Sequence, residues 1–302
     1  MSLFAPLAAL ALERYQPQVP ELPAKQIAYG QRWLLEHLNA GAIQHGVLAW
    51  LLAALIPALT LAFVVYMAAG LLELLSLAFE VIVLYFLFGF RQASFLAASI
   101  ARALTGNDLP LARTLLNVWQ PGLLSSDNPD DLVRQCLEET IKAALASLFG
   151  VLFWYWVAGI GGAALYSLSH ACRDQWQGEA EFVNFSARVV YWMDWLPARA
   201  MGFSFAIVGN FQDAAECWRS QAVRWQAIGR DTNEAVILAS GAGALGIRLG
   251  GAIQIEGQLI TRPELGLDEQ PSPDSVEAGV ALIWRAALLW FSMAGLLWLG
   301  SL

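Results

Sequence analysis

Long apolar runs alternate with polar stretches along the chain and predict helices that cross a membrane. Residues 47–70 contain no charged side chain, and about 20 apolar residues suffice to span the hydrocarbon core. Residues 71–90 and 143–168 form a second and a third apolar run, and residues 189–209 and 280–302 form two more. We therefore expect an all-α polytopic membrane protein with about four to five transmembrane helices.

The same pattern predicts six segments. They are a re-entrant or interfacial segment with an amphipathic helix at 1–46, a transmembrane hairpin at 47–90, a cytoplasmic helical loop at 91–142, a transmembrane pair with a polar connection at 143–210, a Gly-rich cytoplasmic segment at 211–279 and a C-terminal transmembrane helix at 280–302. Basic residues flank the hairpin on both sides, namely Lys25, Arg32, Arg91, Arg102 and Arg113. Because positive loops stay in the cytoplasm, both ends of the hairpin are expected there.

Composition supports a bilayer and excludes nucleic acid as a partner. Hydrophobic residues make up 58% of the 302 residues and charged ones 14%, with a net charge of −8. A nucleic-acid partner would require a basic face. The three cysteines are odd in number and show no CxxC spacing, so we expect small apolar packing groups without a disulfide framework or a metal site. They are Cys136, Cys172 and Cys217, with His37, His45 and His170 as the available histidines.

Two carboxylates interrupt the second apolar run. Glu73 and Glu80 are seven residues apart, which places them on nearly the same helix face. They could form a polar stripe that serves a site. We favour the alternative that Glu73 lies at the interface while Glu80 bonds a neighbouring helix, since carboxylates in lipid must face protein or water.

Two ionisable residues also lie in the run at 189–209. Asp194 and Arg199 are about 140° apart around an ideal helix, so they pair only if Pro197 bends the chain. An ionisable residue in a membrane marks a functional site by default, but a structural Asp–Arg pair is an equal alternative. This run could also lie in the interface instead of spanning.

Common catalytic motifs give weak support for an enzyme. GAGALG places Gly241, Gly243 and Gly246 in the GxGxxG spacing of dinucleotide-binding loops. No βαβ pattern surrounds it, so chance or helix packing is favoured. The sequence contains no GxxxxGK[ST], HExxH or GxSxG. Further upstream, Glu138 and Lys142 have the i,i+4 spacing of a helical ion pair.

A longer string carries a resemblance. ALGIRLGGAIQIEGQLITRPELG at 244–266, with PAR at 197–199, resembles the C-terminal half of the CbiB/CobD family, the adenosylcobinamide-phosphate synthases of cobalamin assembly. Members join an aminopropanol-type amine to a corrinoid carboxylate in an ATP-dependent ligation. The resemblance therefore implies corrinoid and nucleotide sites.

The chain departs from that family at several polar positions. LGDP and HPV-type motifs are missing from the first forty residues. The YKxxNTLDSM signature falls on YSLSHACRDQ at 166–175, which puts Ser167, His170 and Arg173 at the family's Lys, Asn and Asp. Val190 and Tyr191 replace paired aspartates, and the asparagine of NxxPAR becomes Asp194. These losses suggest lost or changed chemistry.

A second resemblance shows similar losses. MSLFAPLAALALERY and DWLPARAMG are similar to the AmpE branch, inner-membrane proteins of Gram-negative bacteria associated with β-lactamase regulation. The leading expectation is thus a non-catalytic signal modulator linked to cell-wall recycling and the response to antibiotics. The runner-up is a divergent adenosylcobinamide-phosphate synthase, and a third hypothesis is a structural membrane partner that assembles through GIGGAA at 159–164.

The expected ligand site combines the glycines with nearby charges. Exposed backbone amides next to Arg248 and Arg262 suit an anion such as a nucleotide or a muropeptide, although we favour solvated or snorkelling arginines. A lipid bilayer, a membrane protein partner and a second copy of the chain are the other expected partners. The candidate ligand-binding residues are Glu139, His170, Asp194, Pro197, Arg199, Gly246, Arg248, Gly250, Gly251 and Arg262.

Overall fold

The computed structural model describes residues 3–15, 21–38, 43–119, 123–124, 128–177, 180–227, 231–255 and 258–300. These fall into two compact units. Unit 1 comprises Met1–Arg91 and Ala146–Pro197, and unit 2 comprises Gln92–Leu145 and Ala198–Leu302. Helix α10 (Ala180–Val208) begins in unit 1 and ends in unit 2, with Pro197 inside it.

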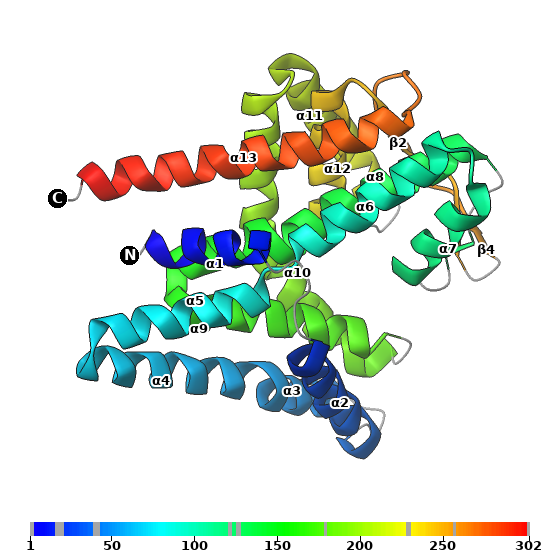
Figure 1. Ribbon diagram of the computed structural model, residues 1–302. Helices are drawn as coiled ribbons and strands as arrows, with labels where there is room; N and C mark the ends of the chain where they lie inside the picture. Colours follow the sequence, from blue (N-terminus) through cyan, green and yellow to red (C-terminus); the bar gives the residue numbers. More distant parts are fainter. Residues whose placement is uncertain are drawn as a thin grey trace. The chain divides into compact units, whose positions relative to one another are not determined.

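Unit 1 is helical throughout its described part. A single extended residue, Leu72, joins α4 to α5, and the two helices pack as a hairpin against each other (Figure 1). Helix α9 packs on both, and α1 packs on α5. The helices of this unit are α1 (Phe4–Tyr15), α2 (Glu21–Leu38), α3 (Ile43–Trp50), the π-helical turn η1 (Leu51–Leu55), α4 (Ile56–Leu71), α5 (Glu73–Leu87) and α9 (Gly150–Gln175), the last preceded by the π-helical turn η2 (Leu145–Phe149).

Four helical stretches of the described chain are long and apolar enough to cross a membrane. They are Gln44–Leu71, Glu73–Thr105, Pro129–Gln175 and Pro273–Gly300. Large apolar side chains remain exposed on them, among them Phe63, Leu74 and Leu296, as expected for surfaces that face lipid. The prediction of an all-α polytopic membrane protein is confirmed. The run at 189–209 lies in α10, which is not among the four.

Polar side chains in unit 1 find partners on neighbouring helices. The Trp50 indole Nε1 donates to Ser169 Oγ at 3.1 Å, and the Trp176 Nε1 donates to the Gln31 carbonyl at 3.0 Å. Tyr155 OH donates to Glu80 Oε2 at 2.5 Å, whereas Glu73 is exposed at the start of α5. The expectation that Glu80 bonds a neighbouring helix is confirmed, so these two carboxylates do not form one polar stripe.

The small residues of GIGGAA serve packing inside unit 1. Ala158 and Gly159 leave helical geometry, Gly159 with a φ of 65°, so α9 is broken there. A Cβ on Gly161 would lie 2.8 Å from the Cβ of Ala62 on α4. The small residues of GIGGAA therefore contact α4 of the same chain. The hypothesis of a structural partner had expected them to contact another protein.

Unit 2 contains the remaining helices. The side chain of Asn128 accepts a hydrogen bond from Asp130 N and caps α8, whose first turn carries Pro129 and two aspartates. Asp231 caps α12 in the same way, through Asn233 N. The helices are α6 (Phe90–Thr105), α7 (Leu109–Trp119), α8 (Pro129–Ala144), α11 (Phe211–Ala227), α12 (Thr232–Leu245) and α13 (Pro273–Gly300).

Unit 2 also contains two small antiparallel sheets, which the sequence analysis did not anticipate. Strand β2 (Arg248–Gly250) pairs with β5 (Glu264–Gly266), so that Leu249 faces Leu265 in the register. Strand β3 (Ile253–Ile255) lies between β1 (Leu123–Leu124) and β4 (Gln258–Ile260). The string that carries the family resemblance therefore forms β-hairpins between α12 and α13.

GAGALG belongs to the end of helix α12. Gly241 and Gly243 lie in its last turns, and Gly246 ends it in the left-handed conformation at φ 74°. A Cβ on Gly243 would lie 2.5 Å from the Asp213 carbonyl oxygen and 2.8 Å from Ala214 Cα on α11. The expectation of helix packing in place of a dinucleotide loop is confirmed.

We predict that Gly243→Ala lowers the stability of the protein. The added Cβ would meet the backbone of α11, which cannot move aside as a side chain can, and overpacking of this kind costs roughly 1–3 kcal/mol. Gly295→Ala on α13 is the matched control, because nothing lies within 4 Å of its Cβ position. Thermal unfolding in detergent should show a lower midpoint for Gly243→Ala alone; equal midpoints would contradict the close packing of α11 on α12.

Candidate functional site

A cluster of buried polar side chains joins α9 to α10 in unit 1. Tyr166 and His170 are one turn apart on α9, and Asp194 faces them from α10. Tyr166 OH donates to Asp194 Oδ1 at 2.7 Å, and His170 Nε2 lies 3.0 Å from the same oxygen. Tyr166 is fully buried, Asp194 is 4% exposed and His170 is 7% exposed. Two predicted ligand residues, His170 and Asp194, thus come together with a tyrosine.

The contacts of Asp194 differ from the pair that the sequence suggested. Its carboxylate contacts Tyr166 and His170, while Arg199 Nη1 donates to Asn233 Oδ1 at 3.0 Å within unit 2. The ion pair between Asp194 and Arg199, one of two alternatives left open above, is replaced by these separate partners. Pro197 is buried in α10.

A second buried cluster holds the glycine-rich hairpin onto α8 in unit 2. Glu138 Oε2 lies 2.8 Å from Arg262 Nη1, and both side chains are 3% exposed. Glu138 Oε1 also accepts from Arg262 Nη2 at 3.1 Å and from Gly250 N at 2.8 Å. Arg262 Nε in turn donates to the Gly251 carbonyl at 3.0 Å. Every nitrogen of this guanidinium is engaged by the protein.

The backbone at positions 250 and 251 has a conformation that favours glycine. Their φ values are 75° and 76°, a region that residues with a Cβ rarely adopt. Trp225 closes the cluster, since the Arg262 guanidinium carbon lies 5.2 Å from the centre of its ring. Gly250, Gly251 and Arg262 are therefore brought together, as a scaffold around Glu138.

Three partly exposed charged side chains lie next to one another, Glu139 and Lys142 on α8 and Glu234 on α12. Lys142 pairs with Glu139 and lies 3.7 Å from Glu234 Oε1. The expected pair of Glu138 with Lys142 is wrong: Glu138 turns to Arg262, and Lys142 takes the neighbouring glutamate at i,i+3. The side chain of Lys142 is 29% exposed.

The other predicted residues of unit 2 have structural partners. Arg248 lies 3.4 Å from Glu264 Oε1 and 3.5 Å from Asp268 Oδ1, so acidic neighbours partly neutralise the charge that was expected to meet an anion. Gly246 ends α12. Whether these residues bind a ligand stays a prediction.

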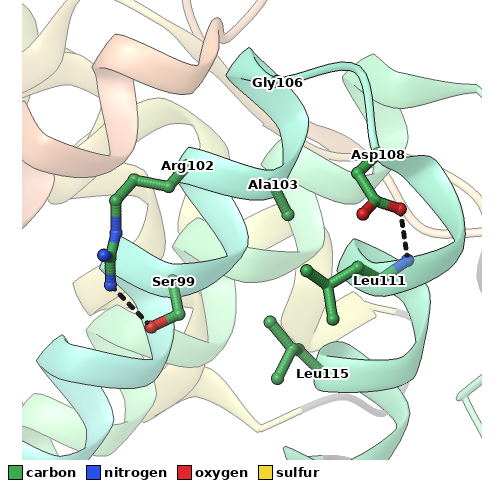
Figure 2. A pocket seen from close by; sticks show the side chains of 7 residues that line it. All are labelled: Ser99, Arg102, Ala103, Gly106, Asp108, Leu111 and Leu115. Atoms are coloured by element: carbon green, nitrogen blue, oxygen red, sulfur yellow. Dashed lines mark hydrogen bonds between the residues drawn. The ribbon is translucent and has the colours of Figure 1, made fainter.

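A separate pocket of about 490 Å³ lies between α6 and α7. Figure 2 shows Arg102 turned back to Ser99 along its own helix, and Asp108 accepting from the backbone of Leu111 at the start of α7. The other lining residues are Ala103, Gly106 and Leu115. No residue from the predicted ligand set lines this pocket.

The cysteines are free and buried, which confirms their expected role as packing groups. Burial, together with the carboxylates of Asp213 and Glu216, raises the pKa of the Cys217 thiol, so it stays protonated at neutral pH. Among the described residues, no group of three or more His, Cys, Asp or Glu side chains is arranged to hold a metal ion.

Comparison with known proteins identifies the family of the chain. The model of the CobD/Cbib protein family matches residues 6–283. The chain belongs to the CobD/CbiB family. The cobalamin biosynthesis protein CobD of Stutzerimonas stutzeri is 33% identical over 265 residues, covering 85% of this chain and 84% of the relative. The protein of the same name from Chromobacterium violaceum is 31% identical over 241 residues, covering 76% and 75%. No solved structure matches the chain.

The leading expectation of an AmpE-like regulator is wrong. The family match covers nearly the whole chain, including the N-terminal half in which the AmpE resemblance began. The relatives are named for cobalamin biosynthesis, and neither β-lactamase regulation nor signalling is supported. Membership of the CobD/CbiB family, one part of the expected resemblance, is confirmed.

Sequence reasoning missed several members of the two clusters. Tyr166 was noted only as the first residue of a signature, although its i,i+4 spacing to His170 places both on one face of α9. Glu138 was passed over in favour of Glu139. No local pattern marks Trp225 or Asn233, because their partners Arg262 and Arg199 lie more than thirty residues away.

We predict that Glu138→Ala is strongly destabilising, by about 3–5 kcal/mol, because it leaves the Arg262 guanidinium buried without its carboxylate. Glu264→Ala is the control; its carboxylate is 60% exposed beside Arg248, and such pairs are worth at most about 1 kcal/mol. Denaturation in mixed micelles measures both. Similar losses for the two variants would refute a structural role for the buried pair.

Proposed function

We propose that the chain acts in cobalamin biosynthesis as a divergent adenosylcobinamide-phosphate synthase in the bacterial inner membrane. The reaction is an ATP-dependent ligation that joins an aminopropanol-type amine to a corrinoid carboxylate. The observation that carries the proposal is the family match over residues 6–283, together with relatives of similar length that are named for this pathway.

Buried ionisable groups in an apolar protein support this proposal. Such groups are costly in a membrane protein and are retained where they serve function. The cluster of Tyr166, His170 and Asp194 lies near the end of α9, one turn before the charged residues Arg173 and Asp174. A water-soluble substrate can reach a helix end more readily than a helix centre, so this cluster is the candidate for the polar substrate.

Charged groups of unit 2 are the candidates for a nucleotide. Lys142 and Arg199 are partly exposed cations on α8 and α10, and cations of this kind bind phosphate oxygens. Glu139 supports Lys142 from the next turn of the same helix. We assign Arg262, Gly250 and Gly251 the task of fixing the hairpin, since the guanidinium is already held by Glu138.

Ligation by the purified protein tests the proposal. With ATP, aminopropanol and a corrinoid that carries a free carboxylate, we expect an amide product detectable by mass spectrometry, and none when ATP is omitted. Growth of a cobalamin-deficient strain carrying the gene gives a second readout. Absence of product and of growth, from protein that unfolds cooperatively, would refute synthase activity.

The departures from the family signature give a further prediction. The family's Lys and Asp fall on Ser167 and Arg173, so the double variant Ser167→Lys, Arg173→Asp restores both. We expect it to raise the ligation rate by about tenfold, equivalent to ~1.4 kcal/mol of barrier. Gly295→Ala serves as the control with an unchanged rate. An equal or lower rate in the double variant would show that the chain does not use these positions in the family's way.

A further inference from the structure

The pocket between α6 and α7 has a charged side chain on each of two walls. Arg102 and Asp108 lie on opposite sides of it in Figure 2. The apolar side chains between them are Ala103, Leu111 and Leu115. The volume of about 490 Å³ falls within the range of small-molecule sites, roughly 300–1,000 Å³. Because Arg102, Asp108 and Leu111 are exposed, a ligand with both charged and apolar parts can enter from outside unit 2.

The guanidinium of Arg102 is held in place without an acidic partner. Its Nε donates to the Ala98 carbonyl at 3.2 Å, and its Nη2 donates to Ser99 Oγ at 3.0 Å. Ser99 Oγ in turn donates to the Phe95 carbonyl at 2.9 Å, so the serine positions the guanidinium. No carboxylate in the described part of the chain pairs with Arg102. Since a guanidinium has five N–H donors, those of Nη1 remain for the oxygens of a phosphate.

Asp108 supplies a negative charge on the other wall. Its Oδ1 accepts from Leu111 N at 3.1 Å and caps α7, while its Oδ2 has no partner among the described residues. The turn between the helices is held by two backbone hydrogen bonds, from Asp108 N to the Ala103 carbonyl at 2.8 Å and from Gly106 N to the Arg102 carbonyl at 2.9 Å. The backbone therefore fixes the two walls relative to each other.

The apolar wall of the pocket continues along α7 as an exposed stripe. Its members follow the i, i+4, i+7, i+8 spacing of one helix face, and they are Leu111, Leu115, Val118 and Trp119. Leu111 is 45% exposed and Val118 is 71% exposed. On the side of α6, the ring of Phe95 is 66% exposed and its centre lies 6.0 Å from the guanidinium carbon. Exposed apolar surface thus adjoins both charged walls.

The place of the pocket in the chain relates it to the bilayer. The stretch Glu73–Thr105 is long and apolar enough to cross a membrane, and the next residue, Gly106, lines the pocket. A spanning helix ends outside the hydrocarbon core, at the depth of the lipid headgroups. Basic pockets beside membrane helices bind such headgroups. A phospholipid has the charged head and the apolar tail that this pocket can accommodate.

We propose that the pocket binds a phospholipid with a phosphoethanolamine headgroup. Arg102 holds the phosphate, Asp108 Oδ2 accepts a hydrogen bond from the ammonium group, and the acyl chains lie along Leu111 and Leu115. The carboxylate disfavours headgroups that carry only negative charge. This inference is independent of the proposed function, because no residue assigned to the ligation lines the pocket.

Native mass spectrometry of the detergent-purified full chain tests the proposal with three lipids of equal acyl length. They are phosphatidylethanolamine, phosphatidylglycerol, which has no ammonium group, and phosphatidylcholine, whose methylated ammonium cannot donate a hydrogen bond. We expect saturable binding of phosphatidylethanolamine, with an affinity about tenfold higher than that of either other lipid. The comparison requires no variant. Equal affinity for the three lipids, or no saturable binding, would overturn the proposal.

Two substitutions assign the binding to this pocket. Arg102→Gln should lower the affinity for phosphatidylethanolamine about tenfold, because a neutral amide replaces the guanidinium. Asp108→Asn keeps an oxygen that can cap α7 but removes the charge, so phosphatidylethanolamine and phosphatidylglycerol should bind equally. Arg219→Gln is the matched control, since Arg219 is an exposed arginine on α11 outside the pocket. Equal losses in the two arginine variants, or an unchanged preference in Asp108→Asn, would refute the assignment.

Soluble phosphoethanolamine distinguishes a lipid from a free amino alcohol phosphate. Without acyl chains it loses the contacts with Leu111 and Leu115, so we expect it to compete only at concentrations more than about tenfold higher. Leu115→Asn should weaken binding of the lipid and leave binding of the free headgroup unchanged. Competition as strong as that of the lipid itself would show that the pocket takes a soluble ligand and would overturn the proposal.

Discussion

A membrane protein must satisfy its polar side chains from within, because lipid offers them no hydrogen bonds. This constraint organises both units. In unit 1, the carboxylates of Glu80 and Asp194 each accept a hydrogen bond from a tyrosine on α9. In unit 2, Glu138 and Arg262 neutralise each other out of contact with water. Each of these interactions joins two elements that are distant in the sequence. A few buried charges and their partners therefore fix how the neighbouring helices and strands pack.

The glycine-rich string illustrates how a family-specific sequence can be structural. Its glycines are needed at left-handed backbone positions, at the end of α12 and in the turn after β2. Its arginines are held by carboxylates: Arg262 by Glu138, and Arg248 by Glu264 and Asp268. In this chain, the backbone conformation and the buried ion pair leave few alternatives at these positions.

The polar substitutions in α9 have a physical counterpart in the cluster. The family's asparagines fall on His170 and Asp194, and these two residues contact each other here. A histidine and an aspartate in contact can hold a proton and a charge, which two asparagines cannot, so this part of the chain differs chemically from the signature that it resembles.

The sequence by itself determined the membrane class, four of the apolar helices and the packing role of the cysteines, because hydrophobic length is a property of short segments. Its strings carried the CbiB/CobD part of the resemblance, but the AmpE-like regulator that they favoured was wrong. It also indicated that Glu80 bonds a neighbour, since a carboxylate in lipid has few options. Only the tertiary structure decided that Glu138 pairs with Arg262, 124 residues away, and that Asp194 meets His170 and not Arg199. Periodicity shows which face of a helix a residue occupies, but the partner on the opposite face is set by how distant elements pack.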